Sequence, residues 1–207
     1  MVHCESKLRL SPSCVNSSKD RPPAPPVGSS YSLALLSAFM STTDYAQFVN
    51  DFRQTIVNAT PRLRDISPEQ SRRKKSADEW APIEILGHLV DSAANNHQRF
   101  VRAQFNDDLV FPEYDQDQWV NGQRYLETSW PELVDFWSLY NLHLAHVLRA
   151  ISPDALTKTR SKHTLDQIAF KLVDKDEPTT LEYLIRDYVD HLRFHLDQIF
   201  SETKSTE

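Results

Sequence analysis

Glycine is scarce in this sequence, with only Gly28, Gly87 and Gly122 among 207 residues. No two of them lie close together, so the chain has no glycine-rich loop of the P-loop or dinucleotide-binding type. The common phosphate-cradling motifs are therefore excluded.

Cysteine is even scarcer, since Cys4 and Cys14 are the only two and both lie near the N-terminus. The rest of the chain therefore has no disulfide framework, no cysteine-based zinc site and no cysteine nucleophile. This composition fits a reducing compartment, and we expect a cytoplasmic protein.

Long apolar runs and basic stripes are also missing. No apolar run approaches the length that spans a membrane, so we expect no membrane partner. The net charge is −6, and the one basic run, residues 72–75, is flanked by Ser, Asp and Glu. We interpret this run as a solvated loop and expect no nucleic-acid partner.

The first 39 residues differ in composition from the rest. They are rich in Ser and Pro and show no helical or strand period, which predicts a disordered extension. Met40 is a candidate start, which would leave residues 1–39 outside the native protein. The alternative is that the apolar run at 33–40 belongs to a secretion signal, although it starts late and lacks a small-residue cleavage site.

Residues 40–207 show helical periodicity. Apolar residues recur at helical spacing in four segments, over about 43–59, 82–106, 129–151 and 179–202. We expect Pro61 to limit the first segment, Pro82 to begin the second, and capping boxes at Ser129-x-x-Glu132 and Thr179-x-x-Glu182 to begin the last two. A short helix is expected near 165–173. With no convincing strand and with long loops, the pattern predicts an all-α four-helix bundle.

Two histidines one turn apart, His191 and His195, are the first candidate metal ligands. Residues four apart lie on one helical face, so both imidazoles can reach one ion, and zinc and its neighbours accept neutral imidazole. Asp187, one turn earlier, could accept the other ring N–H of His191. The alternative is an ordinary solvated pair, because this spacing is common without a metal.

His88 is the candidate third ligand. It begins a polar stripe with Asp91, Asn95 and Arg99 on one face of the second segment. This stripe lies nearly opposite the strongest apolar stripe of the same helix, so the sequence alone does not show that His88 meets the other two. His97 lies within that apolar stripe and is interpreted as a core histidine. His143 is a weaker pocket candidate, and His3, His146 and His163 are given no role.

Three motifs in order resemble one family. Residues 80–100 contain the pattern H-x-x-D-S-x-x-N-x-x-x-R-F. A loop segment then places Tyr114-Asp115 before Trp119, and His191-x-x-x-His195 follows near the end. Together they resemble the DinB-like superfamily, and most closely its YfiT-type branch, over about residues 43–201.

The resemblance implies a four-helix bundle with one divalent metal, zinc or nickel, on His88, His191 and His195. It also implies a small-molecule substrate and a homodimer. Relatives in this superfamily include S-transferases that use low-molecular-weight thiols and proteins described as metal-dependent hydrolases. The chain departs from the branch at Phe194 and Gln198, where further histidines are typical, and this departure puts the substrate and the thiol in doubt.

Three functional hypotheses follow. A thiol deprotonated at the metal gives an S-transferase, which would need a small thiol cofactor because this part of the chain lacks cysteine. A metal-activated water gives a hydrolase, and a non-catalytic site gives a sensor or dimerisation module. We expect Asp91, Asn95, Arg99 and Asp187 to lie around the site, Arg99 to bind a carboxylate or else pair with Asp91 or Glu84, and Tyr114 and Trp119 to close over it. No catalytic residue can be named.

Overall fold

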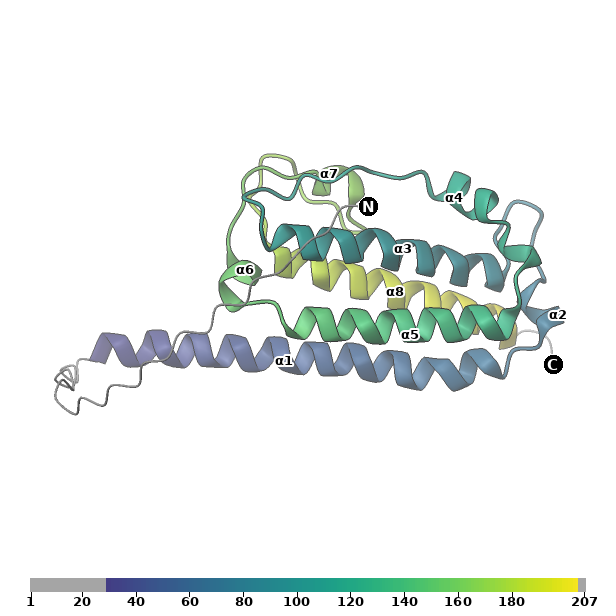
Figure 1. The fold of residues 1–207 in the computed structure, drawn as a ribbon, viewed down its shortest axis with the longest axis horizontal. Helices are drawn as coiled ribbons and strands as arrows, with labels where there is room; N and C mark the ends of the chain where they lie inside the picture. The colour runs from purple at the N-terminus through teal and green to yellow at the C-terminus, as the bar shows by residue number, and fades with distance from the viewer. Residues whose placement is uncertain (1–28, 205–207) are drawn as a thin grey trace, which may run out of the picture. The chain divides into compact units, whose positions relative to one another are not determined.

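The four long helices pack side by side as a bundle. The computed structural model describes the backbone of residues 29–204 and the side chains of residues 43–204. Ala38–Glu207 form one compact unit, to which the following description refers. The long helices are α1 (Ser29–Arg64), α3 (Pro82–Ala103), α5 (Trp130–Arg149) and α8 (Leu181–Lys204) (Figure 1). The described residues contain only two isolated β-bridges, so the predicted all-α four-helix bundle is confirmed.

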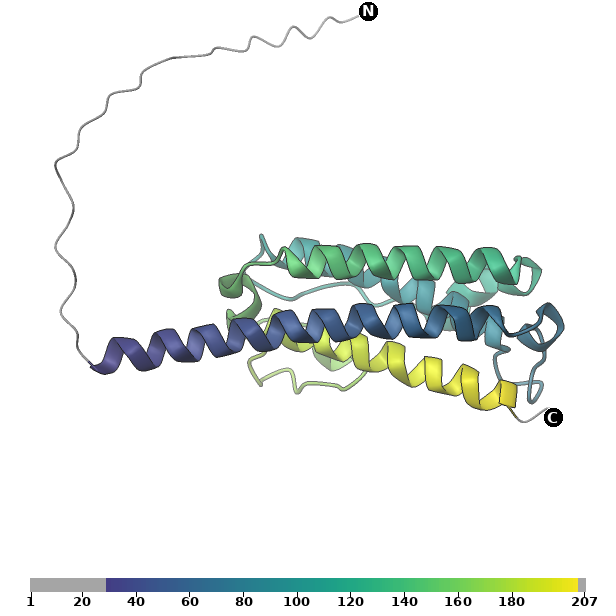
Figure 2. The same ribbon diagram turned by 90° about the horizontal axis from the view of Figure 1, so that it is seen from below.

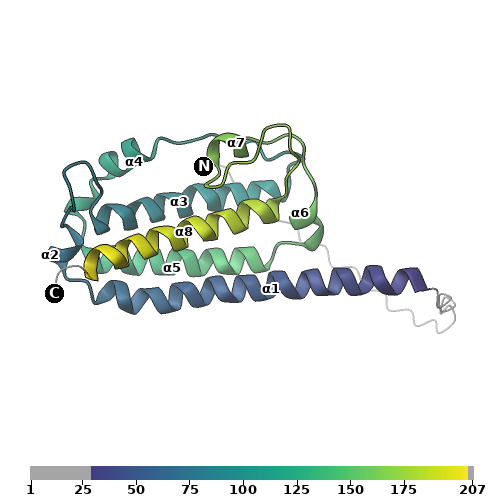
Figure 3. The same cartoon turned by 180° about the vertical axis from the view of Figure 1, so that it is seen from behind.

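The order of the helices produces one parallel pair that includes α3. This helix packs against both α5 and α8, while α1 lies between α5 and α8 on the opposite side (Figure 2). Helices α3 and α5 run in the same direction, and α1 and α8 run in the other (Figures 1 and 3). The chain between α3 and α5 therefore travels back along the bundle, and residues 104–115 run over α3 (Figure 1).

Helix α1 is longer at both ends than the sequence suggested. It begins at Ser29, so residues 29–39, which we assigned to the disordered extension, are helical. This stretch follows Gly28 and contains no Gly or Pro, and its Leu and Ala residues favour a helix. Residues 1–28 lie outside the described residues. Pro61 does not end α1, which continues to Arg64. Leu63 in this last turn is fully buried, and its carbonyl accepts a hydrogen bond from the Trp130 indole at 2.9 Å.

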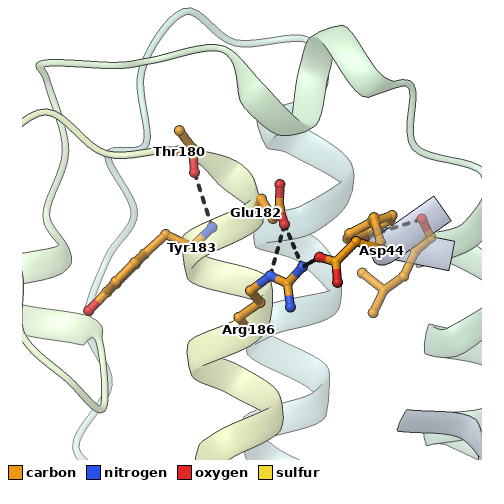
Figure 4. A network of polar contacts seen from close by, with 7 residues as sticks. Asp44, Thr180, Glu182, Tyr183 and Arg186 are labelled. Atoms are coloured by element: carbon orange, nitrogen blue, oxygen red, sulfur yellow. Dashed lines mark hydrogen bonds and ion pairs between the residues drawn. The ribbon is translucent and has the colours of Figure 1, made fainter. Parts of the chain in front are cut away.

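The start of α8 lies one residue later than the predicted capping box. Thr180, not Thr179, accepts the Tyr183 backbone N–H at 3.1 Å (Figure 4). Thr179 is extended and pairs its backbone with Arg160, at 2.8 and 3.0 Å. Glu182 instead contacts Arg186, which also pairs with Asp44 of α1 and so joins the two parallel helices (Figure 4).

The capping box predicted at Ser129 is also absent. Ser129 is the N-cap of α5, but its side chain makes no capping hydrogen bond. Helix α5 instead begins with Trp130 and Pro131, and a proline in the first turn needs no N–H partner.

The connections contain short helices, of which the last matches the short helix expected near 165–173 and the others lie where we expected loops. These are α2 (Pro68–Ser71), α4 (Gln116–Gln123), the 3-10 helix η1 (Tyr125–Glu127), α6 (Pro153–Thr157) and α7 (Leu165–Ile168). The two long connections also contact each other. The Leu109 N–H donates to the Lys162 carbonyl at 2.9 Å, and buried Arg160 donates to the Ala103 carbonyl at the end of α3, also at 2.9 Å.

Helix α3 is covered on all sides over its first half. Every residue from Pro82 to Ala93 is buried, including the polar side chains of Glu84, His88 and Asp91. A helix with one apolar stripe normally leaves its polar face to solvent. Here the returning connection covers that face, so the polar stripe of α3 becomes part of the interior.

Among the described residues, no helix is both long enough and apolar enough to cross a membrane.

Gly87 provides a test of how closely η1 packs on α3. A Cβ at this position would lie 2.2 Å from Cδ2 of the buried Tyr125 ring. We expect Gly87→Ala to destabilise the protein by about 1–3 kcal/mol, because the ring would have to move in a packed interior. The measurement is urea unfolding followed by circular dichroism.

Gly122→Ala is the matched control, because a Cβ there meets nothing within 4 Å and the residue lies inside α4. We expect it to leave stability unchanged or to raise it by up to about 1 kcal/mol. Equal unfolding midpoints for the two variants would contradict the close packing.

Candidate metal centre

His88 of α3 meets His191 and His195 of α8 inside the bundle. The Nε2 atoms of His88 and His191 are 3.2 Å apart. Each of the three histidines offers one ring nitrogen within 4.8 Å of the other two. The structure thus brings His88 together with the two histidines of α8, although His88 lies opposite the main apolar stripe of α3.

Burial keeps these imidazoles neutral. It lowers the pKa of His88 to about 4, with a smaller contribution from nearby His195. Burial, followed by the proximity of His195 and His88, lowers the pKa of His191 to about 3. The pKa of His195 is also lowered by burial, against the opposing effect of its hydrogen bond to Gln198. Neutral imidazole is the form that binds a metal ion.

Gln198, which the sequence analysis gave no role, orients His195. The Nδ1 of His195 lies 3.0 Å from the Gln198 carbonyl oxygen, which can only accept, so Nδ1 carries the proton. Nε2 is then left with its lone pair. The Gln198 amide in turn donates to Glu202 at 3.2 Å, which fixes the orientation of the amide.

The donor set fits a divalent cation. The Nε2 atoms of His88 and His191 lie 3.2 Å apart, at hydrogen-bonding distance, and a ring nitrogen of His195 lies close by, so three neutral imidazoles offer nitrogen ligands to one point. Nδ1 of His88 is buried and has no hydrogen-bond partner within the described part of the chain. Three histidine nitrogens are a known ligand set for zinc that leaves a position open.

Aromatic rings surround the three histidines, and they are not all the ones we expected. The Trp80 ring lies 5.1 Å from that of His88, and the Phe170 ring lies 5.3 Å from that of His191. Phe194 lies 5.1 Å from His195. Trp119 contacts Tyr114, with ring centroids 5.0 Å apart, and remains 38% exposed. Of this pair, only Tyr114 lines the cavity described next.

A cavity of about 530 Å³ reaches the histidines from the side of the returning connection. His88 and His191 form part of its wall. From α3 the wall continues with Ser92, Asn96 and Arg99, and from the connection it includes Glu113, Tyr114, Asp115 and Asp117. This volume is within the range of small-molecule sites. Burial raises the pKa of Tyr114 to about 12, so its hydroxyl stays protonated at neutral pH.

Arg99 lines this cavity, as expected. It does not form the alternative ion pair with Asp91 or Glu84. Its guanidinium donates to Asn96 at 3.4 Å and to the Pro112 carbonyl at 3.0 Å. Glu84 pairs instead with Lys74 at 3.0 Å, and Asp91 interacts with uncharged groups. Arg99 is nevertheless buried, with only 5% of its surface exposed.

Asp91 and Asn95 do not line the cavity. The Asp91 carboxylate accepts hydrogen bonds from the Tyr125 hydroxyl at 2.7 Å and from Gln123, and so holds the returning connection on α3. Burial raises its pKa against these two hydrogen bonds. The Asn95 amide donates to the Asp91 carbonyl at 2.9 Å. Tyr125 and Gln123 carried no sequence signal for this contact, because both lie in a segment without helical period.

Asp187 lines the cavity but does not accept the hydrogen bond from the His191 ring N–H that we expected. Its two oxygens accept the backbone N–H groups of Phe170 and Lys171, at 2.8 and 2.7 Å. Asp187 therefore fixes the loop that carries Phe170 against His191. Burial raises the pKa of Asp187, and the two backbone hydrogen bonds oppose this.

The other described histidines lie outside the cluster. His97 is half-buried and contacts the Tyr140 hydroxyl at 3.3 Å, while His143 and His146 are exposed. His163 is buried, with Nε2 donating to the Glu177 carbonyl at 2.9 Å and Nδ1 accepting from the Leu165 N–H. His163 thus stabilises the second connection, a role that its polar sequence context concealed.

Comparison with known proteins places this arrangement in a family. The family model of the DinB superfamily matches residues 51–199, and the chain belongs to that superfamily. A solved structure of YfiT from Bacillus subtilis matches with a TM-score of 0.61 and 15% identity, covering 90% of this chain and 93% of that one. That protein is described as a probable metal-dependent hydrolase with an unusual four-helix bundle topology. No curated protein matches this chain.

The lowered histidine pKa values predict how stability depends on pH in the metal-free protein. An unfolded chain binds a proton at each imidazole near pH 6.5, whereas folded His88 and His191 resist protonation down to about 4 and about 3. Between these values the unfolded state carries more protons, so stability falls as the pH is lowered from 6.5 to 4. We expect a loss of more than about 1 kcal/mol in urea unfolding with a chelator present.

His191→Leu should flatten this dependence, because it removes one of the groups that must stay neutral. Asp91 and Asp187 have raised pKa values and act in the opposite sense at the acidic end, but equally in both proteins. Parallel stability curves for the wild type and the variant would contradict the buried, neutral state of His191.

Proposed function

We propose that this protein is a metal-dependent enzyme that transfers a low-molecular-weight thiol to an electrophilic small molecule. The three histidines would hold one divalent cation, zinc or nickel, and the cavity would admit the reactants. The observation that carries the proposal is the cluster of three neutral imidazoles, two of which, His88 and His191, line a cavity of about 530 Å³. A structural zinc site would normally add a fourth protein ligand, and no Cys, Asp or Glu of the described residues joins the cluster.

The engagement of the buried carboxylates favours a thiol over water as the nucleophile. The buried carboxylates of Asp91 and Asp187 are both engaged by hydrogen bonds to Tyr125 and to the backbone of residues 170 and 171. Both oxygens of Asp187 are occupied, and Asp91 does not line the cavity. The other carboxylates of the wall, of Glu113, Asp115 and Asp117, are exposed and lie outside the histidine cluster. When bound to the three histidines, a divalent cation would lower the pKa of a thiol enough to deprotonate it without a base.

The residues of the chain would then position the reactants. The thiol would release its proton to solvent, its sulfur would form a bond to an electrophilic carbon, and the leaving group would depart from that carbon with the bonding electrons. Trp80 and Phe170 flank the histidines and limit the access of water. The Tyr114 hydroxyl, which stays protonated at neutral pH, can donate a hydrogen bond to the electrophile.

Hydrolysis is the second candidate, and the description of YfiT as a probable metal-dependent hydrolase favours it. The same three imidazoles would support a cation that lowers the pKa of water toward neutrality. Such a reaction would use the same cavity without a thiol.

Metal content tests the site itself. We expect tag-free protein to contain about one divalent metal ion per chain and His191→Ala to lose it, because two imidazoles with no further donor bind weakly. The measurement is elemental analysis by mass spectrometry after dialysis.

His143→Ala is the matched control, since His143 is an exposed histidine outside the cluster, and it should keep the metal. Full occupancy in His191→Ala, or none in the wild type, would overturn the proposed site.

The reaction type is tested by comparing two assays on the metal-loaded protein. We expect conjugation of a reactive aryl halide with small thiols to exceed hydrolysis of aryl esters and amides, and to disappear in His88→Ala. The rate is followed by absorbance. Ester or amide hydrolysis without any conjugation would favour the hydrolase instead.

A further inference from the structure

Arg99 is a buried cation without a carboxylate partner. Its side chain emerges from α3 three turns after His88 and lies in the wall of the same cavity. The guanidinium has five N–H donors, and its two hydrogen bonds go to uncharged oxygens, of Asn96 and Pro112. No salt bridge to Arg99 is present among residues 43–204. A buried charge of this kind is costly unless something compensates it.

The sequence offered Glu84 and Asp91 as ion-pair partners for Arg99, and in the structure both carboxylates interact with other groups. Glu84 pairs with Lys74, and Asp91 accepts from Tyr125. Burial lowers the pKa of Arg99, and no carboxylate opposes the shift. An arginine nevertheless stays protonated at neutral pH, so its positive charge faces the cavity without a directly paired carboxylate.

The cavity follows α3 from the histidines to Arg99. His88, Ser92, Asn96 and Arg99 lie on one face of the helix and all line it. Arg99 lies eleven positions after His88, which corresponds to about 16 Å along the helix axis. A ligand that reaches both ends must therefore be elongated, with one group at the histidines and an acceptor group several atoms away.

We propose that the cavity binds an elongated small molecule with a carboxylate at the end away from its reactive group, and that Arg99 binds this carboxylate. This inference rests on the proposed function, because the three histidines would receive the other end. A guanidinium and a carboxylate form paired, charge-assisted hydrogen bonds, which explains why an arginine rather than a lysine serves here. The carboxylate would also form the direct ion pair with Arg99 that no carboxylate of residues 43–204 forms.

The protein loaded with Co²⁺ provides a test that does not depend on activity. Thiols that reach the cation change its visible spectrum, so binding can be titrated directly. The probes are mercaptopropionate, mercaptohexanoate and mercaptooctanoate, each compared with the alcohol of the same length. We expect the longer acids to bind at least about tenfold more tightly than their alcohols, whereas mercaptopropionate, too short to reach Arg99, shows no such preference.

Arg99→Gln should abolish the preference for the longer acids and leave the affinity for the alcohols unchanged. Arg99→Lys keeps the charge but cannot form bidentate hydrogen bonds, and should retain only part of the preference for the longer acids. Circular dichroism melting of both variants monitors the fold. If Arg99→Gln fails to fold, the comparison of acids with alcohols in the wild type and in Arg99→Lys still decides the question.

The outcomes separate this inference from the function on which it rests. If Co²⁺ does not bind, or if no thiol changes its spectrum, the proposed thiol chemistry is wrong. If thiols bind but acids and alcohols of every length bind equally, the role of Arg99 is wrong while the metal site stands. A preference that persists unchanged in Arg99→Gln would likewise overturn it.

Discussion

The parallel arrangement of α3 and α5 determines where a cavity can form. Two antiparallel neighbours can be joined by a short turn, but two parallel helices require the chain to return along their length. Here the return runs over the polar face of α3. That face would otherwise be solvated, and it becomes one wall of the cavity while residues 113–117 of the returning chain form another.

Burying this face requires that each polar group on it find a partner. Glu84 accepts the Ala81 N–H at 2.8 Å and contacts Lys74, and Asp91 holds Tyr125 and Gln123. These carboxylates thus act as attachment points for the chain around α3. Arg99 likewise donates to the Pro112 carbonyl of the returning chain. Neither Arg99 nor any of the three clustered histidines has a carboxylate partner among residues 43–204. The three imidazoles can therefore bind a cation, and the guanidinium of Arg99 can bind an anion.

The bundle could be predicted from the sequence, because the apolar residues of the long helices recur at helical spacing. The bundle and its four main helices followed from apolar spacing, and the pairing of His191 with His195 followed from their position on one turn. The convergence of His88 on that pair could not be derived from a helical wheel, which treats one face as inside and the opposite face as outside. Helix α3 breaks this assumption, since both faces are buried. The resemblance to a known bundle supplied what the periodicity could not.

The contacts that could not be predicted from the sequence are those made by the connecting segments. Tyr125, Gln123 and Phe170 lie in connections without periodicity, and they reach α3 and α8 only because the connections return across the bundle. Asp187 looked like a partner for His191 because both share a helical face. Two backbone N–H groups from residues 170 and 171 compete for the same carboxylate, and they occupy both of its oxygens.

The charges around the cavity also constrain how a ligand would be selected. Glu113, Asp115 and Asp117 are exposed carboxylates in its wall, and the whole chain carries a net charge of −6. A carboxylate approaching from solvent therefore meets a negative potential before it reaches Arg99. Such a field slows association at low salt and is screened at higher salt, whereas the buried contact with Arg99 is screened little. Selection for an anionic ligand would thus come from the short-range geometry at Arg99 and from a slow dissociation rate, not from long-range attraction.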